Sequence, residues 1–368
     1  MKKMIAAVMS ICVLLTGCTD QIKLKNLLFV DIMGLDYVDQ DKDKTLQFSF
    51  VTSSLNDAYQ GGGKPANQYH EQTGKNIYEA VIRSNKEMPG ILSVLETRLY
   101  IISSSIAKDD PLSHLHIASQ FQSNPLYAYL AVYDGDLSKL LSKPKIKDNT
   151  VSNYLFELLE DEIERGRIPS NKLLNYILGG DQFMNDFILN RFEPYKDEVR
   201  LGGTALFSNG KYTGYNLSNE DTLLALLMNG EPGKLQFIFG KSQGLDYSIH
   251  VQDTKQAIHI QHSGNNLSEI ALSLRMKVRL VDDGKMLEMH TKQELDEKQQ
   301  IIAEHLTARA EKIVEILQQA NCDYFQLGQQ VAAYHPNLYQ SLNWREQYPS
   351  LTVKPTVKVA IINSGNLE

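Results

Sequence analysis

The sequence predicts an α+β fold of more than one domain, with antiparallel or mixed sheets and segregated helices. Three observations predict it. Residues 46–50 alternate apolar and polar side chains, the period of a half-buried strand. The segment from about Leu295 to Asn321 repeats its apolar residues every three or four positions, as an amphipathic helix does. In the C-terminal half a run of predicted strands comes first and helices follow, so the two kinds of element are segregated.

The first half of the chain mixes predicted strands and helices. The apolar run Leu27–Leu35 and the alternating residues 46–50 predict two strands joined as a hairpin across residues 39–44. The triple glycine at 61–63 predicts a loop. The elements expected after it are a helix near 76–86, strands at 97–103 and 126–133, and a helix that begins near Val151 and ends at Gly166.

Strands separated by turns dominate from Val199 onward. Asn209-Gly210, between two strand-like segments, is the strongest hairpin signal in the sequence. Ser218 is expected to cap a short helix that ends at Met228. The elements expected after it are strands at 235–239, 245–251, 257–262 and 270–281, the long helix, a helix at 324–334, and a last strand at 351–361 that lies at an edge or bulges at Pro355.

These patterns divide the chain into three parts: a signal peptide at 1–17, an N-terminal α+β region at 18–197 and a C-terminal α+β domain at 198–368. The long helix is expected to lay four apolar side chains on an antiparallel sheet: Ile302, Leu306, Ile313 and Leu317. Three lysines of the helix region are expected to tolerate substitution: Lys292, Lys298 and Lys312.

The first eighteen residues have the pattern of a bacterial lipoprotein signal. Lys2 and Lys3 supply positive charge, and the apolar segment 4–15 is too short to span a membrane. Leu15-Thr16-Gly17-Cys18 resembles a lipobox, so Cys18 is the expected lipidation site, with an S-diacylglycerol and an N-acyl chain such as palmitate. Several acyl chains, at ~0.8 kcal/mol per buried CH₂, give an effectively permanent anchor. The alternative is an ordinary signal peptide with a chance cysteine.

The net charge argues against nucleic acid as a partner, and the cysteine content argues against an intramolecular disulfide. The chain has 37 Lys and Arg against 44 Asp and Glu, a net charge of −7, which argues against nucleic acid as a partner. Outside the leader and Cys18 the remaining cysteine is Cys322, so the exported chain cannot form an intramolecular disulfide. We expect Cys322 to be a small buried side chain near a helix end.

A search for catalytic or metal-binding patterns finds no convincing set, so we expect no enzyme, no cofactor and no metal. His114 and His116 lie two positions apart, which is no common ligand spacing on a helix. Three further histidines fall in predicted strands: His250, His259 and His262. A zinc site made from them would require the strand to bulge. Gly202-Gly203 lacks the lysine and hydroxyl residue of a phosphate-binding loop and is expected to be a turn.

Two further features allow a structural and a functional interpretation. The helix after Val151 carries an acidic cluster, which is either a solvated face or a docking face for cations: Glu157, Glu160, Asp161, Glu162 and Glu164. The single tryptophan, Trp344, either pins the long helix onto the sheet or is an exposed recognition residue. The structural interpretation is the favoured one in both cases.

Three segments, in order along the chain, resemble the C subunits of spore germinant receptors, the Ger(x)C or GerAC-like lipoprotein family. They are the mature start Cys18–Asp36, the hairpin and helix start Gly202–Thr222, and the tail from Cys322 through Trp344 to Gly365. In the first segment Thr19 stands where the family usually has a tryptophan, which suggests a divergent paralogue.

The resemblance implies a membrane-anchored subunit of a spore nutrient germinant receptor, held by Cys18 on the outer face of the inner spore membrane. It implies that the subunit is needed for the germination response through association with integral-membrane A-type and B-type subunits. The alternative is an extracytoplasmic solute-binding lipoprotein of an importer, which shares the signal, the anchor and the size. That fold would show alternating β/α units and a ligand cleft between two lobes.

Overall fold

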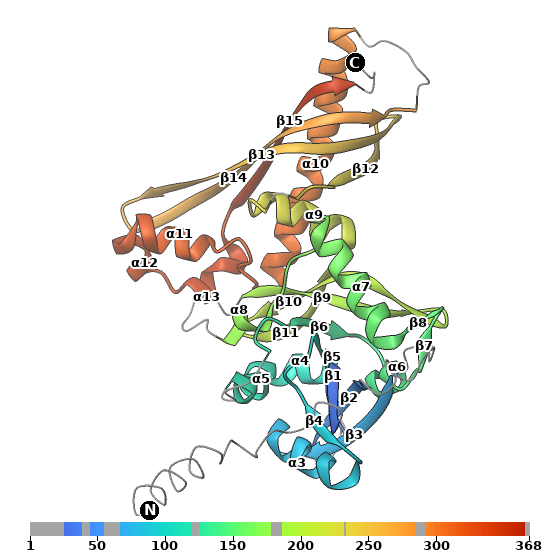
Figure 1. The fold of residues 1–368 in the computed structure, drawn as a ribbon. Helices are drawn as coiled ribbons and strands as arrows, with labels where there is room; N and C mark the ends of the chain where they lie inside the picture. Colours follow the sequence, from blue (N-terminus) through green and yellow to red (C-terminus); the bar gives the residue numbers. More distant parts are fainter. Residues whose placement is uncertain are drawn as a thin grey trace, which may run out of the picture.

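The structure is a computed structural model that describes residues 26–38, 45–54, 67–119, 125–177, 186–231, 233–284 and 291–364. It contains two main sheets. Figure 1 shows the larger sheet in the lower half of the molecule and the C-terminal sheet, with the long helix α10, in the upper half. The α+β, multidomain class with mixed sheets and segregated helices is confirmed.

Nine of the described strands form the large sheet, in the order β11-β10-β9-β6-β5-β1-β2-β3, with β4 beside β1. The central pairs β1–β5, β5–β6 and β6–β9 are parallel, whereas the pairs toward both edges are antiparallel. The strands are β1 (Leu27–Tyr37), β2 (Leu46–Ser54), β3 (Gln68–Gly74), β4 (Ile91–Ser93), β5 (Leu99–Ser103), β6 (Tyr129–Tyr133), β9 (Phe187–Tyr195), β10 (Glu198–Ser208) and β11 (Lys211–Leu217).

Helices cover both faces of the large sheet. One buried cluster joins the sheet to α3, α4, α5 and α8, and a second joins it to α6 and α7. Central strands with two covered faces are therefore almost continuously apolar. The helices are α3 (Ile77–Glu87), α4 (Ser104–Asp109), α5 (Pro111–Ser119), α6 (Leu137–Leu141), α7 (Val151–Glu164) and α8 (Leu173–Ile177); a small hairpin of β7 (Lys145–Ile146) and β8 (Asn149–Thr150) precedes α7.

The C-terminal sheet has the order β12-β13-β14-β15, and β15 returns parallel to β14 at the edge. Pro355 therefore lies in an edge strand, one of the two placements that the sequence predicts for it. The elements are α9 (Asn219–Met228), β12 (Phe237–Ser242), β13 (Leu245–Ser263), β14 (Asn266–Asp282), α10 (Lys292–Gln319), α11 (Leu327–Tyr334), α12 (Pro336–Ser341), α13 (Trp344–Gln347), the 3₁₀ turn η2 (Tyr348–Ser350) and β15 (Val353–Ser364).

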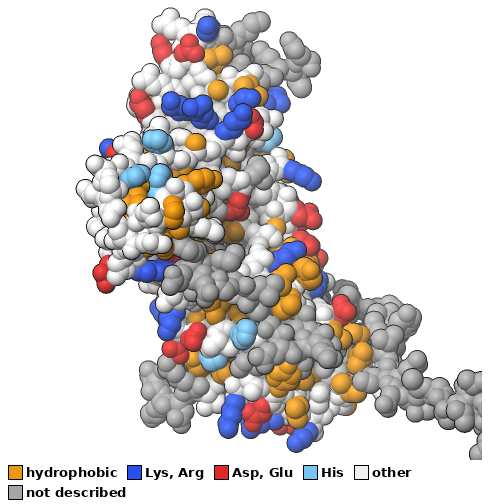
Figure 2. All heavy atoms as spheres, turned by 90° about the vertical axis from the view of Figure 1, so that its left-hand side faces the viewer, with side chains coloured by type: hydrophobic (Ala, Val, Ile, Leu, Met, Phe, Trp, Pro, Cys, Tyr) orange, Lys and Arg blue, Asp and Glu red, His pale blue; other side chains and the backbone are white. Residues whose placement is uncertain are grey.

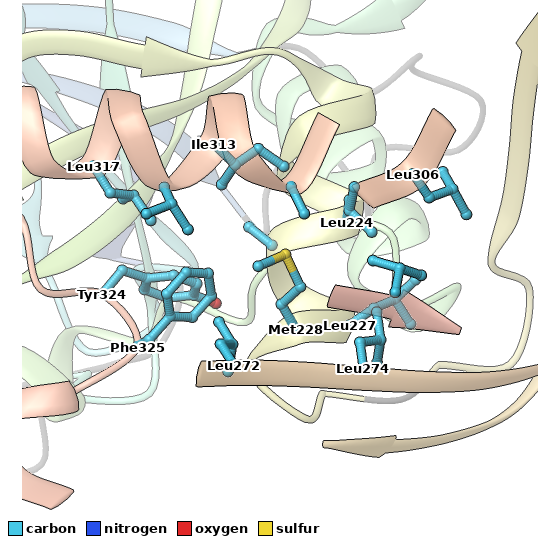
Figure 3. Packing of buried hydrophobic residues seen from close by; sticks show 14 of the residues in the cluster. Leu224, Leu227, Met228, Leu272, Leu274, Leu306, Ile313, Leu317, Tyr324 and Phe325 are labelled. Carbon is cyan, nitrogen blue, oxygen red and sulfur yellow. The ribbon is translucent and has the colours of Figure 1, made fainter. Parts of the chain in front are cut away.

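The long helix packs on this sheet as the sequence predicts. Its four expected apolar side chains are all buried, in one cluster with β14 and α9. Figure 3 shows Leu306, Ile313 and Leu317 of α10 pointing toward Leu272 and Leu274 of β14. The same cluster includes Ile188, Leu206 and Leu217 of the large sheet, so the two sheets share one continuous core.

Several local predictions are confirmed. Asn209 and Gly210 have φ values of 50° and 77° and turn β10 into β11, as a two-residue hairpin requires. The Ser218 side chain accepts a hydrogen bond from the Asp221 N–H and caps α9. Gly166, with φ 72°, follows the end of α7. The loop expected at 61–63 lies outside the described residues.

Two predictions about the strands and turns of the C-terminal half are wrong. Gly202-Gly203 is no turn but a bulge within β10, where the pairing with β9 shifts between Leu201 and Thr204. A side chain at Gly203 would meet the carbonyl oxygen of Leu217 at 2.0 Å, so the close approach of β11 requires glycine. The predicted strands 245–251 and 257–262 are one strand, β13. Its pairing with β14 shifts at a bulge between Val251 and Asp253 and then continues.

The expected tolerance of Lys298 is also contradicted. Its side chain is buried against Asp283 and forms an ion pair with that carboxylate. Lys298 lies one helical turn before Ile302, so the period of α10 places it on the buried face; the expected tolerance followed from its charged residue type and not from its position.

The division predicted between residues 197 and 198 falls in the tight turn between β9 and β10, where Tyr195 pairs with Glu198. The hydrogen bonds of the large sheet continue through this turn into β10 and β11. The separation of the chain into two folding units stays a prediction.

Candidate functional site

The tail segment that the sequence singles out folds into a buried loop where α10 ends. Asn321 has φ 48°, and the N–H groups of Asn321 and Cys322 donate to the carbonyls of Gln318 and Leu317. This pattern reverses the chain at a helix C-terminus. It directs Cys322 and the next residue, Asp323, back toward the large sheet.

Asp323 organises the loop. Its carboxylate accepts the backbone N–H groups of Leu327 and Gly328, each at 2.8 Å, and the indole N–H of Trp344 at 3.0 Å. Burial raises the pKa of Asp323 to about 6, although the two backbone N–H groups favour its charged form. One carboxylate thus holds the start of α11 and the start of α13 together.

A second buried carboxylate, Asp186, lies directly before β9 and binds three other parts of the chain. It accepts the N–H of Asp323 at 2.9 Å and the N–H of Asn209, in the β10–β11 turn, at 2.8 Å. Arg345 of α13 donates to both of its oxygens at 2.6 and 2.7 Å. The Ser208 hydroxyl, beside the same guanidinium at 3.2 Å, donates to the Asn321 carbonyl at 2.6 Å. We call Asp186, Ser208, Asn321, Asp323, Trp344 and Arg345 the junction.

The Trp344 side chain packs against one side of the junction. It is buried, and its ring lies against Gly328 so closely that a side chain at that position would meet the indole at 2.7 Å. Tyr339 and Tyr348 pack around it, with ring centroids 6.3 and 5.9 Å away. Trp344 is therefore a buried structural residue and not an exposed recognition residue, but it fixes α13 against α11 and does not contact α10 in the way that was predicted.

Cys322 is a fully buried free thiol beside a helix end, as predicted. Burial raises its pKa well above the usual value, and nearby Asp186 and Asp323 oppose the thiolate further. The Tyr348 hydroxyl donates to the Cys322 carbonyl at 3.0 Å. The junction therefore offers no activated nucleophile; its chemistry is that of a fixed connection between the large sheet and the C-terminal helices.

The structure does not bring the histidines of the two predicted sets together. His114 lies on α5 with its ring edge-on to Tyr37, and burial lowers its pKa. The His250 ring stacks on Phe237 with 4.4 Å between the ring centroids. The rings of His262 and His335 have their centroids 4.6 Å apart. Among the described residues no three histidine, cysteine or acidic side chains are arranged to hold a metal ion.

The acidic helix α7 is partly neutralised by arginines that follow it. Arg165 pairs with Asp161 and Glu162, at 3.4 and 3.0 Å, and Arg167 pairs with Glu162 at 3.5 Å. These ion pairs favour the interpretation of a solvated face. Cys18, the predicted lipid site, lies outside the described residues, and no helix within the described part of the chain is long and apolar enough to cross a membrane.

The protein is a multidomain α+β protein in which the junction ties the large sheet to the C-terminal helices, and comparisons with known proteins identify its class. Residues 20–193 match the family described as spore germination protein N-terminal domain, and residues 202–365 match spore germination B3/GerAC like, C-terminal. The chain belongs to the Ger(x)C family of spore germination proteins.

Individual relatives agree with this assignment. Spore germination protein GerQC of Bacillus cereus is 22% identical over 97% of each chain. The putative spore germination protein YfkR of Bacillus subtilis strain 168 is 21% identical over 73% of this chain and 71% of its own. The crystal structure of the GerBC protein superposes with a TM-score of 0.56 at 14% identity, covering 90% of this chain and 97% of that chain. It shows the same fold.

Sequence reasoning missed three members of the junction: Asp186, Ser208 and Arg345. Asp186 and Arg345 are 159 positions apart, and neither belongs to a recognisable pattern. Arg345 follows Trp344 directly, which was its only signal.

Proposed function

We propose that the chain is the lipid-anchored, non-catalytic C subunit of a spore nutrient germinant receptor. In this proposal Cys18 holds it on the outer face of the inner spore membrane, where it associates with integral-membrane A-type and B-type subunits. The observation that carries the proposal is the match of both family domains, in order, over 20–193 and 202–365. The lipobox Leu15-Thr16-Gly17-Cys18 supports the anchor.

The fold supports this proposal over the solute-binding alternative. An importer's binding protein would need two lobes of alternating β/α units, with a cleft between them. Here β12, β13 and β14 form an antiparallel run, α10 follows them, and one core joins the two sheets.

The anchor is tested by replacing Cys18. In a strain that lacks the native gene, cells producing wild type or the Cys18→Ala variant are fed a fatty-acid analogue, and the labelled protein is measured. We expect the Cys18→Ala variant to lose the label and the spores to germinate slowly. Cys322→Ala is the matched control and keeps the label, because this thiol is buried. A Cys18→Ala protein that labels as strongly as wild type contradicts the anchor.

A further inference from the structure

The exposed face of the C-terminal sheet carries three cations in one row. Lys255 of β13 pairs with Arg275 of β14, which pairs with Lys358 of β15. Directly paired residues project from the same face of a sheet. All three side chains are exposed, whereas their chain neighbours Leu274 and Val357 are buried against α10. With strands about 4.8 Å apart, three positive charges lie within roughly 10 Å. We call these residues the cation row.

The cation row is not neutralised by ion pairs of its own. Its three residues form no ion pair with any residue that the structure describes, whereas the flanking lysines do: Lys277 pairs with Asp253 at 3.4 Å, and Lys354 pairs with Glu269. Like charges directly opposite each other destabilise a sheet. The row therefore opposes folding, and an external anion would remove that repulsion.

The surroundings leave the row open to a partner. On one side the next row consists of small side chains, Ala257, Ser273 and Thr356. On the other side it consists of Asp253, Lys277 and Ala360, of which the first two neutralise each other in an ion pair. Large apolar side chains are also exposed on this face: Phe239 (63%), Val281 (49%) and Ile362 (57%). Figure 2 shows Lys and Arg side chains gathered beside hydrophobic ones at the height of the C-terminal sheet. Protein interfaces combine exposed apolar side chains with a polar rim, and arginine is enriched in them whereas lysine is not.

We propose that the cation row binds a cluster of Asp or Glu carboxylates on a partner protein. The inference rests on the proposed function, in which the chain is one subunit of a receptor. The net charge of −7 disfavours general attraction to an anionic surface, so the positive row selects a local anionic cluster.

The position of the row favours a protein over the bilayer as the source of that anion. Cys18 precedes Asn26 by eight positions, a length that spans at most about 29 Å when fully extended. The chain then enters β1 in the large sheet, and the C-terminal sheet lies at the other end of the molecule (Figure 1). Phospholipid headgroups carry the same kind of charge, and the experiment separates the two sources.

The test uses the unlipidated chain 19–368 with two triple variants of equal charge. The row variant is Lys255→Gln/Arg275→Gln/Lys358→Gln. The control variant is Lys86→Gln/Lys211→Gln/Lys312→Gln, which changes exposed lysines on three other elements. Binding of short poly-L-glutamate and of phosphatidylglycerol vesicles is measured at low and at physiological salt. A thermal midpoint of the row variant at or above that of wild type shows that it folds.

We expect wild type and the control variant to bind poly-L-glutamate equally, and the row variant to bind about tenfold more weakly with a smaller salt dependence. Equal binding by the row variant, or no binding by wild type, overturns the proposal. Row-dependent binding to vesicles without binding to poly-L-glutamate also overturns it and makes the bilayer the occupant. Co-purification of wild type with receptor subunits is a separate measurement, so failure of the proposed function is recognised independently.

Discussion

The indole N–H of Trp344 donates to the buried carboxylate of Asp323 at 3.0 Å, although the two residues lie 21 positions apart. Through Asp186 the same loop is bonded to the β10–β11 turn. The C-terminal helices are thus fixed to the large sheet by directional bonds as well as by apolar packing. Because a buried carboxylate that loses a donor keeps its desolvation cost, each junction bond is expected to affect the whole chain.

Replacing Trp344 tests this dependence. Trp344→Phe keeps an aromatic ring but removes the N–H donor, so Asp323 loses one of its three bonds. We expect the free energy of unfolding of chain 19–368, measured in urea, to fall by about 2–3 kcal/mol. Tyr334→Phe, at a side chain that is 74% exposed, is the control and leaves the midpoint in place. Equal midpoints for both variants contradict this role of Trp344.

Stability depends on pH through Asp323. Its pKa rises from 3.8 to about 6 on folding because of burial, with Asp186 adding to the effect. The folded state therefore binds this proton more tightly, and the contribution of Asp323 is full below pH 3.8 and is lost as the pH rises through 6. Asp323→Asn removes the titration. Between about pH 4 and pH 7 we expect the stability difference to move in favour of that variant by up to about 3 kcal/mol. A difference that is constant over this range contradicts the raised pKa.

The lysines of α10 differ in their burial. Lys298→Ala removes the cation that pairs with the buried Asp283 carboxylate, and we expect it to cost about 3–5 kcal/mol of unfolding free energy. Lys292 and Lys312 are exposed, and alanine at either position is expected to change stability by less than about 0.5 kcal/mol. Urea unfolding of the three variants measures this. If Lys298→Ala behaves like the other two, the buried ion pair adds nothing to stability.

Two glycines with similar φ values allow the cost of backbone conformation to be distinguished from the cost of a steric clash. Gly203 and Gly214 have φ values of 86° and 88°, but a side chain at 214 meets nothing within 4 Å. Gly214→Ala is expected to cost about 1–2 kcal/mol, the conformational penalty alone. Gly203→Ala also collides with the Leu217 carbonyl and is expected to cost more than about 3 kcal/mol. Thermal unfolding compares the two, and equal losses would show that β11 can move away without penalty.

The sequence predicted the elements whose signal is local. The period of α10, the Asn209-Gly210 turn and the cap at Ser218 depend on neighbouring residues, and each was placed correctly. Trp344 and Cys322 were predicted to be buried because of their residue types. The family followed from motifs in order along the chain.

The missed features depend on contacts between distant segments. Asp186 reaches Arg345 only after both sheets have formed, so no spacing signals the pair. The cation row forms only when three strands pair in one particular register. The pairing of Arg275 with Lys358 depends on β15 returning parallel to β14 after α10. Gly202-Gly203 looks like a turn because bulges and turns both use glycine. Lys298 follows the buried face of α10 by position, but its residue type predicted exposure, and its ion-pair partner Asp283 lies 15 positions away on a preceding segment.

Co-purification from spore membranes tests the central claim most directly. Tagged wild-type protein is extracted in detergent from the inner spore membrane, and the proteins that accompany it are identified by mass spectrometry, with Cys18→Ala as the comparison. The account predicts that wild type brings down the two integral-membrane subunits of one germinant receptor and that Cys18→Ala brings down less of both. Wild-type protein that elutes alone, or together with the permease of an importer, would contradict it.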